Sequence, residues 1–185
     1  MIPKLILASA SPRRLELLKN AKINPDIIHP ANIDETIKKK EKSNFYLKRI
    51  SLEKALNVQE KYKEDVILAA DTIVSTNQKI IGKPVDDKEA VKTLKFLSGR
   101  NHNVKTGICV LFKNKKKFKI VSTKIKFKSL HQKEIDDYIK PKEWRDISGS
   151  YAIQGYAERF IIKIIVSYSN FVGLPLYETI NMLKS

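Results

Sequence analysis

The chain has 185 residues and a formal net charge of +16 at pH 7, from 36 Lys and Arg against 20 Asp and Glu. This length suits one well-filled core, so we expect a single domain over residues 1–185. A lone cysteine, Cys109, excludes a disulfide or a cysteine-based zinc site within the chain. No apolar run approaches the roughly 20 residues of a membrane-spanning helix, and the first residues lack the pattern of a signal peptide. We therefore expect a cytoplasmic protein with no membrane partner.

The net charge leaves two classes of partner, a nucleic acid or an anionic small molecule. Most of the basic residues are lysines scattered along the chain, apart from the runs at residues 38–40 and 113–117. Aromatic side chains that could stack on bases are not interleaved with these runs. We interpret both as solvated charge and expect no specific nucleic-acid partner. A basic nucleic-acid-binding module is the alternative.

The first strand and helix are predicted at residues 5–9 and 12–20, joined by a turn of small residues. Ser11 can cap the helix, and Pro12 suits its first position because the missing N–H would have no partner there. The free N–H groups at this terminus and the forked side chains of Arg13 and Arg14 suit phosphate oxygens. For these residues alone, a capped helix with solvated arginines is the simpler interpretation.

An extended piece at residues 24–30 leads to an acidic pair, Asp34 and Glu35, in a predicted loop. Apolar residues then recur at helical spacing and predict a helix over residues 45–60. Lys54 lies on or beside the apolar stripe of that helix. A lysine there usually extends to water, so only a nearby acceptor would give it a function.

The apolar run at residues 66–70 predicts a buried strand that ends in Asp71 and Thr72. In open α/β sheets, ligands bind beyond the carboxyl ends of strands, which makes Asp71 a catalytic candidate. An aspartate that closes a turn is the alternative. A turn at residues 76–79 then leads back into a second strand, after which Lys83 should lie near Asp71.

The rest of the chain predicts a mixed α/β fold. Asp86 and Glu89 have capping-box spacing at the start of a helix over residues 86–97. Two alternating segments, 103–112 and 118–127, predict an antiparallel hairpin. The remaining predicted elements are a helix at 130–140, a strand at 160–166 and a helix at 176–183. Between them, residues 146–155 carry Tyr151 and Gln154 between glycines and look like a site loop.

Taken together, these motifs resemble the Maf family of nucleoside triphosphate pyrophosphatases along essentially the whole chain. Each motif is weak alone, and their order and spacing carry the resemblance. Ile147 stands where the family usually has lysine, so we assign it no role. The matching motifs are Ser11-Pro12-Arg13-Arg14, Asp34-Glu35, Arg49 with Lys54-Ala55, Ala70-Asp71-Thr72, Gly82-Lys83-Pro84, residues 98–107, Tyr151 to Gly155, and Val172 to Leu176.

The resemblance implies an α/β fold with a mixed central sheet flanked by helices, in two lobes around a cleft. It implies hydrolysis of a nucleoside triphosphate to the monophosphate and pyrophosphate with a divalent cation, and it suggests a homodimer. Arg13, Thr72 and Gln154 match the branch that acts on dTTP and UTP. A sister branch that acts on 7-methyl-GTP, or on another nucleoside triphosphate, is the alternative. A role in septum formation is associated with the family name, and no sequence feature supports or excludes it.

Residue chemistry adds roles to this resemblance. Attack of water at the α-phosphorus needs a proton acceptor, for which we expect Asp71, and positive charge around the phosphate oxygens. Ser11, Arg13, Arg14, Lys54 and Lys83 are the expected phosphate-binding residues. Glu35 and Asp71 are the expected ligands of magnesium or manganese, because hard cations prefer carboxylate oxygens. The amide of Gln154 can pair with the edge of uracil or thymine. The scheme requires none of the histidines, His29, His102 and His131.

Overall fold

The computed structural model describes residues 2–76 and 79–184, and their contacts divide the chain into two compact units. The first unit contains the residues up to Thr72, Thr106–Val121 and the segment from Gly173 onward. The second contains Ile73–Lys105 and Ser122–Val172. The chain therefore passes between the units at four places. That the two units form one domain stays a prediction.

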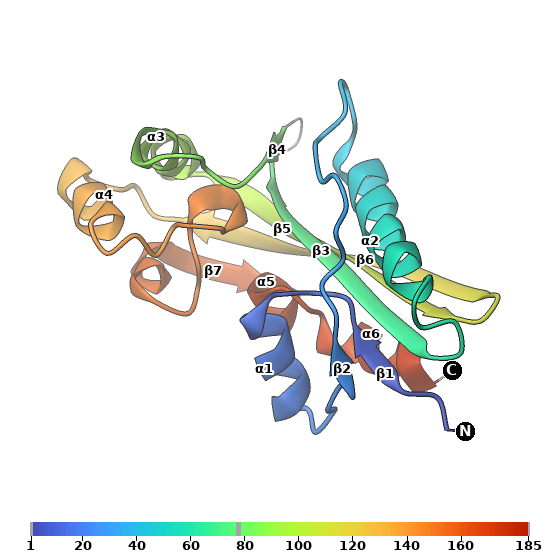
Figure 1. Cartoon of the computed structure of the whole chain (residues 1–185). Helices are drawn as coiled ribbons and strands as arrows, with labels where there is room; N and C mark the ends of the chain where they lie inside the picture. Colours follow the sequence, from blue (N-terminus) through green and yellow to red (C-terminus); the bar gives the residue numbers. More distant parts are fainter. Residues whose placement is uncertain (1, 77–78, 185) are drawn as a thin grey trace. The chain divides into compact units, whose positions relative to one another are not determined.

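The strands form a mixed sheet with the order β2-β1-β3-β5-β6-β7, and β4 pairs with β3 (Figure 1). β1 pairs in parallel with both β2 and β3, whereas the β3–β4 and β6–β7 pairs are antiparallel. This confirms the predicted mixed sheet. The strands are β1 (Leu5–Leu7), β2 (Ile27–Ile28), β3 (Val66–Ser75), β4 (Ile80–Ile81), β5 (Asn101–Phe112), β6 (Lys115–Phe127) and β7 (Ile161–Ile165).

Six α-helices flank these strands within the described residues. They are α1 (Pro12–Asn20), α2 (Ser43–Gln59), α3 (Asp87–Leu97), α4 (Gln132–Ile139), α5 (Tyr168–Val172) and α6 (Leu176–Lys184). α1 has the predicted bounds, and α2 to α4 and α6 lie within about two residues of theirs. α5 and the 3-10 turns η1 (Ser148–Ser150) and η2 (Tyr156–Phe160) fall in segments without a prediction of helix. None of the described helices combines the length and apolarity that a membrane crossing requires.

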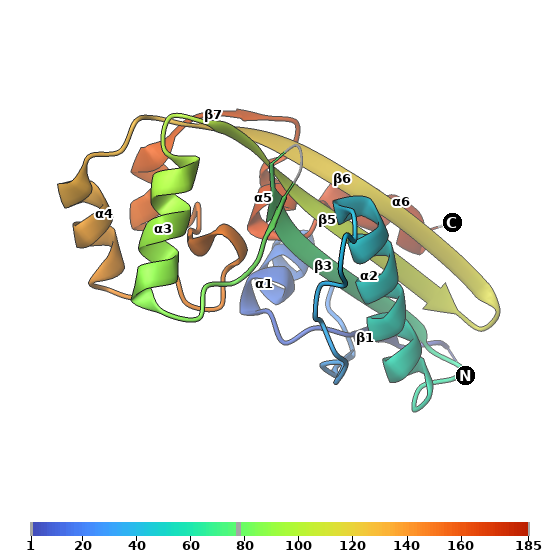
Figure 2. The same cartoon turned by 90° about the horizontal axis from the view of Figure 1, so that it is seen from above.

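In the first unit, α2 lies along β3, as Figures 1 and 2 both show. Ala55 and Val58 of α2 pack against Ile67 and Ala69 of β3 and against Cys109 of β5. Burial of these apolar side chains is the main force that fixes the helix on the sheet. Side chains at positions 67 and 69 therefore face α2, and so does the next side chain of the same face, at position 71.

β3 differs from its prediction at the carboxyl end. The strand continues through Asp71 and Thr72 to Ser75, so neither residue lies beyond its end. Ile73 and Val74 are β-branched and buried, and Val74 pairs with Ile81 of β4, which extends the strand. Asp71 is therefore a buried charge within a strand. The predicted turn at 76–79 falls partly on residues 77 and 78, which lie outside the described residues.

The β5–β6 hairpin is longer than predicted. β5 begins at Asn101 and β6 at Lys115, and the two-residue turn Lys113–Asn114 joins them. A connection this short requires antiparallel strands. The second half of the basic run 113–117 therefore belongs to a strand and not to a turn.

In the second unit, α3 and α4 lie side by side (Figures 1 and 2). Asp86 caps α3 by accepting a hydrogen bond from the Glu89 amide at 2.7 Å. The Glu89 carboxylate in turn accepts from the amide of Val85 and not from that of Asp86, so only half of the predicted capping box forms. Beside these helices is an aromatic cluster made of His102, Phe127, Tyr138, Tyr151 and Phe160.

Candidate active site

α1 starts where the sequence predicts. Ser11 is the N-cap, with its hydroxyl oxygen 3.5 Å from the Arg14 amide, and Pro12 is the first helical residue. The hydroxyl of Ser9 accepts a hydrogen bond from the Ser11 amide at 3.2 Å. Two small hydroxyl side chains thus shape the backbone at this helix terminus.

Lys54 of α2 lies between two carboxylates. Its Nζ donates to Asp71 Oδ1 at 2.8 Å and lies 2.9 Å from Glu35 Oε1. Lys54 and Asp71 are only 8% and 7% exposed, so the pair is buried. Lys54 could have a function only if an acceptor lay nearby, and the structure provides two, Asp71 and Glu35.

Asp71 and Thr72 present their side chains to opposite faces of β3, as successive strand residues do. Asp71 meets Lys54 on the face covered by α2. Thr72 meets Arg14 of α1 on the other face, where the guanidinium donates to Thr72 Oγ1 at 3.1 Å. β3 therefore directs the Asp71 carboxylate toward α2 and the Thr72 hydroxyl toward α1.

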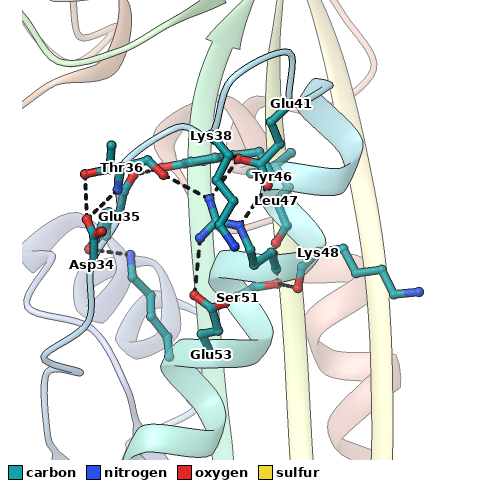
Figure 3. A network of polar contacts seen from close by, with 12 residues as sticks. Asp34, Glu35, Thr36, Lys38, Glu41, Tyr46, Leu47, Lys48, Ser51 and Glu53 are labelled. Atoms are coloured by element: carbon teal, nitrogen blue, oxygen red, sulfur yellow. Dashed lines mark hydrogen bonds and ion pairs between the residues drawn. The ribbon is translucent and has the colours of Figure 1, made fainter.

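Glu35 is held by a network on the loop before α2 (Figure 3). The hydroxyl of Tyr46 donates to the Glu35 carbonyl oxygen at 3.1 Å. Arg49 donates to the Thr36 carbonyl at 3.0 Å and to both carboxylate oxygens of Glu41 at 2.7 and 2.8 Å. These contacts brace the loop against α2, so Glu35 is presented to Lys54 from a defined backbone.

The charges of this network shift the pKa values of its members. The hydrogen bonds from Arg49 lower the pKa of Glu41 to about 2, and they raise the pKa of Arg49 itself. Burial raises the pKa of Tyr46, and the negative charges of Asp71 and Glu35 raise it further. Tyr46 is thus a neutral donor beside the acidic pair.

Sequence reasoning gave no role to Arg49, Glu41 or Tyr46. Arg49 stood in a matched motif, and its spacing to Glu53 predicts the i,i+4 ion pair that the structure has at 3.3 Å. The contacts with Glu41 and Thr36 lie across a loop, where spacing predicts nothing. Asp34, the other half of the acidic pair, accepts from the amide and hydroxyl of Thr36 at 2.9 and 2.6 Å and does not meet Lys54 in any described contact.

Arg14 is buried on the opposite side of β3. Its guanidinium donates to Ser9 Oγ at 2.9 Å and to the Gly173 carbonyl at 2.9 Å, in addition to Thr72. Burial lowers the pKa of Arg14, and the charges of Asp71 and Glu35 oppose that shift. Arg13, the next arginine in the motif, is only half-buried.

Two expected site residues, Lys83 and Gln154, belong to the second unit and are exposed. The Gly149 amide donates to the Gly82 carbonyl at 3.1 Å, which ties the segment before Lys83 to the loop that carries Gln154. That loop is anchored by Tyr151, whose buried hydroxyl hydrogen-bonds Nε2 of His102. The predicted site loop therefore has a fixed base and an exposed glutamine.

The structure thus brings Glu35, Lys54 and Asp71 into contact in the first unit, with Thr72 and Arg14 beside them across the strand. Ser11 and Arg13 lie in the same unit at the start of α1. No group of three or more His, Cys, Asp or Glu among the described residues could hold a metal ion. Magnesium is commonly bound by one or two carboxylates, with water and substrate phosphates as its other ligands, and the Glu35 and Asp71 pair fits that donor set.

Comparison with known proteins gives consistent results. The family model described as Maf-like protein matches residues 4–185. A protein of Mesorhizobium japonicum named dTTP/UTP pyrophosphatase is 44% identical to the chain, across 100% of this chain and 92% of its own length. Proteins of the same name from Rhizobium etli and Zymomonas mobilis are each 47% identical, across 97% and 100% of this chain and 91% and 92% of their own lengths.

Proposed function

Because the chain belongs to the Maf-like protein family, we propose that it is a pyrophosphatase that hydrolyses dTTP and UTP to the nucleoside monophosphate and pyrophosphate. Relatives that align along nearly their whole length carry this activity in their names. The observation in the structure that supports it best is the buried carboxylate of Asp71, bonded to Lys54 and neighboured by Glu35. Such a group suits a general base better than an exposed acid does.

Asp71 is the proton acceptor in this proposal. Its Oδ1 is bonded to Lys54, so Oδ2 is the oxygen that takes the proton from the attacking water. The water must approach the α-phosphorus in line with the departing pyrophosphate. Lys54 fixes the carboxylate in place, and its positive charge favours the negative charge that builds up on the phosphate oxygens.

Glu35 and Asp71 would hold a divalent cation, magnesium or manganese. Such an ion, when bound, withdraws charge from phosphate oxygens and makes a bound water more acidic. The chain's own contribution to phosphate binding is the start of α1, with Ser11 and Arg13, together with Lys54 and Lys83. Their N–H donors and positive charges are those that phosphate oxygens require.

Gln154 is proposed to read the base. Its side chain is exposed and takes part in no hydrogen bond between described residues, while Ile153 and Tyr151 beside it are buried. The amide can donate to a carbonyl oxygen of uracil or thymine and accept from N3–H. Cytosine carries an amino group and an unprotonated N3 at that edge, so CTP should be a much poorer substrate.

The proposed setting is the cytoplasm, with a nucleoside triphosphate as the partner and a homodimer as the assembly. The buried free thiol of Cys109 is compatible with a reducing compartment. A substrate panel that includes modified nucleotides tests whether the enzyme also clears these.

The direct test is to measure pyrophosphate release and kcat/KM for dTTP, UTP, CTP, dCTP, GTP and 7-methyl-GTP with one metal ion. We expect dTTP and UTP to lead, CTP and dCTP to follow far behind, and 7-methyl-GTP to react negligibly. Hydrolysis in heavy-oxygen water should label the monophosphate and leave pyrophosphate unlabelled. Equal kcat/KM for UTP and 7-methyl-GTP would refute the base assignment, and label in pyrophosphate would refute attack at the α-phosphorus.

The alternative from the net charge of +16 is nucleic-acid binding. If this function holds, duplex DNA should bind tightly at low salt and much more weakly as salt rises. The pyrophosphatase proposal expects only weak binding that is independent of sequence. A gel-shift titration at two salt concentrations, run beside the pyrophosphate assay, decides between the two. Tight binding at physiological salt without pyrophosphate release would favour the nucleic-acid function.

A further inference from the structure

Arg14 is a buried cation whose described hydrogen bonds go to uncharged oxygens. Its Nε donates to the Gly173 carbonyl, and its two terminal nitrogens donate to Ser9 Oγ and Thr72 Oγ1, at 2.9 to 3.1 Å. The residue is 8% exposed. Three directions of the planar fork are therefore used inside the protein, which leaves the guanidinium poorly disposed to turn toward a ligand.

The hydroxyl of Thr72 is the centre of this arrangement. Besides Arg14, it lies 2.9 Å from Thr106 Oγ1 and 3.2 Å from the Gly173 carbonyl oxygen. A hydroxyl has one donor and two acceptor positions. A carbonyl only accepts, so Thr72 donates to Gly173 and accepts from Arg14, and its remaining lone pair accepts from Thr106. The hydroxyl is thus used fully by protein groups.

These bonds join positions that are far apart in sequence. The chain leaves the first unit after Thr72 and re-enters it at Thr106 and at Gly173. The Thr72 hydroxyl therefore contacts the residues at two other boundaries of the unit. Gly173 has φ +129°, a conformation that a side chain would strain, and a Cβ built there would lie 3.7 Å from Thr72 Oγ1 and 3.9 Å from Arg14 Nε. Thr72 directly follows Asp71 in β3, so displacement of one moves the other.

We propose that Arg14 is a positioning residue for catalysis, which acts through Thr72 on the strand that carries Asp71, and not a phosphate-binding residue. Arg13, half-buried at the same helix start, then supplies the guanidinium for phosphate. The activity readouts below rest on the proposed pyrophosphatase function. The stability readout does not.

The adjacent arginines provide a matched pair of variants, Arg14→Lys and Arg13→Lys. A lysine keeps the charge but cannot donate along three fixed directions. For Arg14→Lys we expect kcat for UTP to fall at least about tenfold, with inhibition by inorganic pyrophosphate unchanged. For Arg13→Lys we expect the inhibition constant of pyrophosphate and the KM for UTP to rise instead. Weaker pyrophosphate inhibition in Arg14→Lys, equal to that in Arg13→Lys, would overturn the proposal.

A double-mutant cycle with Thr72→Val tests whether Arg14 acts through the hydroxyl. Valine keeps the shape of threonine and removes the bond, so adding Arg14→Lys to Thr72→Val should cost little further kcat. If the kcat losses of Arg14→Lys and Thr72→Val multiply in the double variant, the inference is contradicted. If Arg14→Lys does not fold, Thr106→Val removes another bond of the same hydroxyl, and it should lower kcat with unchanged pyrophosphate inhibition.

The same cycle can be run on urea unfolding, without any substrate. The effects of Arg14→Lys and Thr72→Val on the unfolding equilibrium constant should fail to multiply, because both remove one shared contact. If the wild-type chain hydrolyses no nucleotide, the proposed function fails, and this cycle still decides whether Arg14 and Thr72 are coupled. Strictly multiplying effects on unfolding would overturn the coupling on which the inference depends.

Discussion

Among single residues, the buried Lys54 distinguishes the candidate site from the rest of the described surface lysines. Withdrawing an ammonium and a carboxylate from water costs several kcal/mol per ion, which is repaid only when the partners are close and well oriented. Lys54 has two such partners, Asp71 and Glu35, within 2.9 Å. Three apolar side chains would avoid this cost, and the proposed catalytic role gives a reason for the charges to be present.

The first prediction concerns Asp71→Asn. Asparagine keeps the size of the side chain but cannot accept a proton from water, so kcat for UTP should fall at least about a hundredfold. The fold should persist because Glu35 still neutralises Lys54. Kinetics with UTP and thermal unfolding of the same sample measure both effects.

Asp87→Asn is a matched control for this change, because Asp87 is an exposed aspartate in the first turn of α3. Its activity should equal that of the wild type. Hydrolysis by Asp71→Asn at a rate near that of the wild type would remove Asp71 from the role of general base.

Among the elements, the site loop packs closely onto the end of β3 at Gly149. A Cβ built at this position lies 2.4 Å from Cγ2 and 2.9 Å from Cβ of Val74. Its φ of +79° is also one that side chains rarely adopt. The loop that carries Gln154 can therefore reach its observed position only with glycine here.

We accordingly predict that Gly149→Ala destabilises the protein by about 2–4 kcal/mol, from overpacking against β3 and from backbone strain. Gly82→Ala is the control, because a Cβ at that glycine meets nothing within 4 Å. It should change the free energy of unfolding by less than about 1 kcal/mol. Urea unfolding of both variants measures the difference, and equal stabilities would contradict the packing argument.

Elements with local signals were predictable from sequence, and contacts across the chain were not. The start of α1 followed from Ser11 and Pro12, and the N-cap of α3 from Asp86, because capping chemistry acts within a few residues. The continuation of β3 past Asp71 had a local signal in the β-branched Ile73 and Val74, but its extent depends on pairing with β4, which is a contact between separate segments.

For the candidate site, the sequence nominates residues but does not predict their contacts, and the functional roles of these residues stay predictions. Periodicity placed Lys54 beside the apolar stripe, and only the fold brings its ammonium to Asp71 and Glu35. The bonds of Arg14 to Thr72 and Gly173 span 58 and 159 residues. Contacts of that sequence separation follow from tertiary packing and not from local patterns. The motif at residues 11–14 therefore predicts the same role for Arg13 and Arg14, whereas in the structure only Arg14 is buried.

Across the whole molecule, surface charges and buried titratable groups contribute very differently to stability. Most of the excess of lysine lies at the surface, where ion pairs such as Lys113 with Glu64 contribute little to stability. Buried groups that must remain neutral have a larger effect, because protonation in the unfolded chain pulls the equilibrium away from the fold. His102, 1% exposed in the aromatic cluster of the second unit, is such a group.

The last prediction follows from the pKa of His102, which burial lowers from 6.5 to about 4. Its ring packs edge-on against Phe127 and Tyr151, and burial raises the pKa of Tyr151, so no charged partner compensates an imidazolium there. Between pH 6.5 and pH 4, the unfolded chain therefore binds one proton more than the folded chain at this residue. Stability is complete above pH 6.5 and falls as the pH approaches 4, by about 3 kcal/mol in total.

Urea unfolding at intervals from pH 7.5 to 4.5 should reveal this loss. In the variant His102→Gln, which can still hydrogen-bond Tyr151 but does not titrate, the free energy of unfolding should depend less on pH across the same range. Glu41, whose pKa lies at about 2, loses its contribution only below about pH 4.5 and so does not obscure the window. His131→Gln removes an exposed histidine and should keep the slope of the wild type. If His102→Gln and the wild type lose stability in parallel, another group is responsible, and His102 is not the buried neutral residue that its surroundings require.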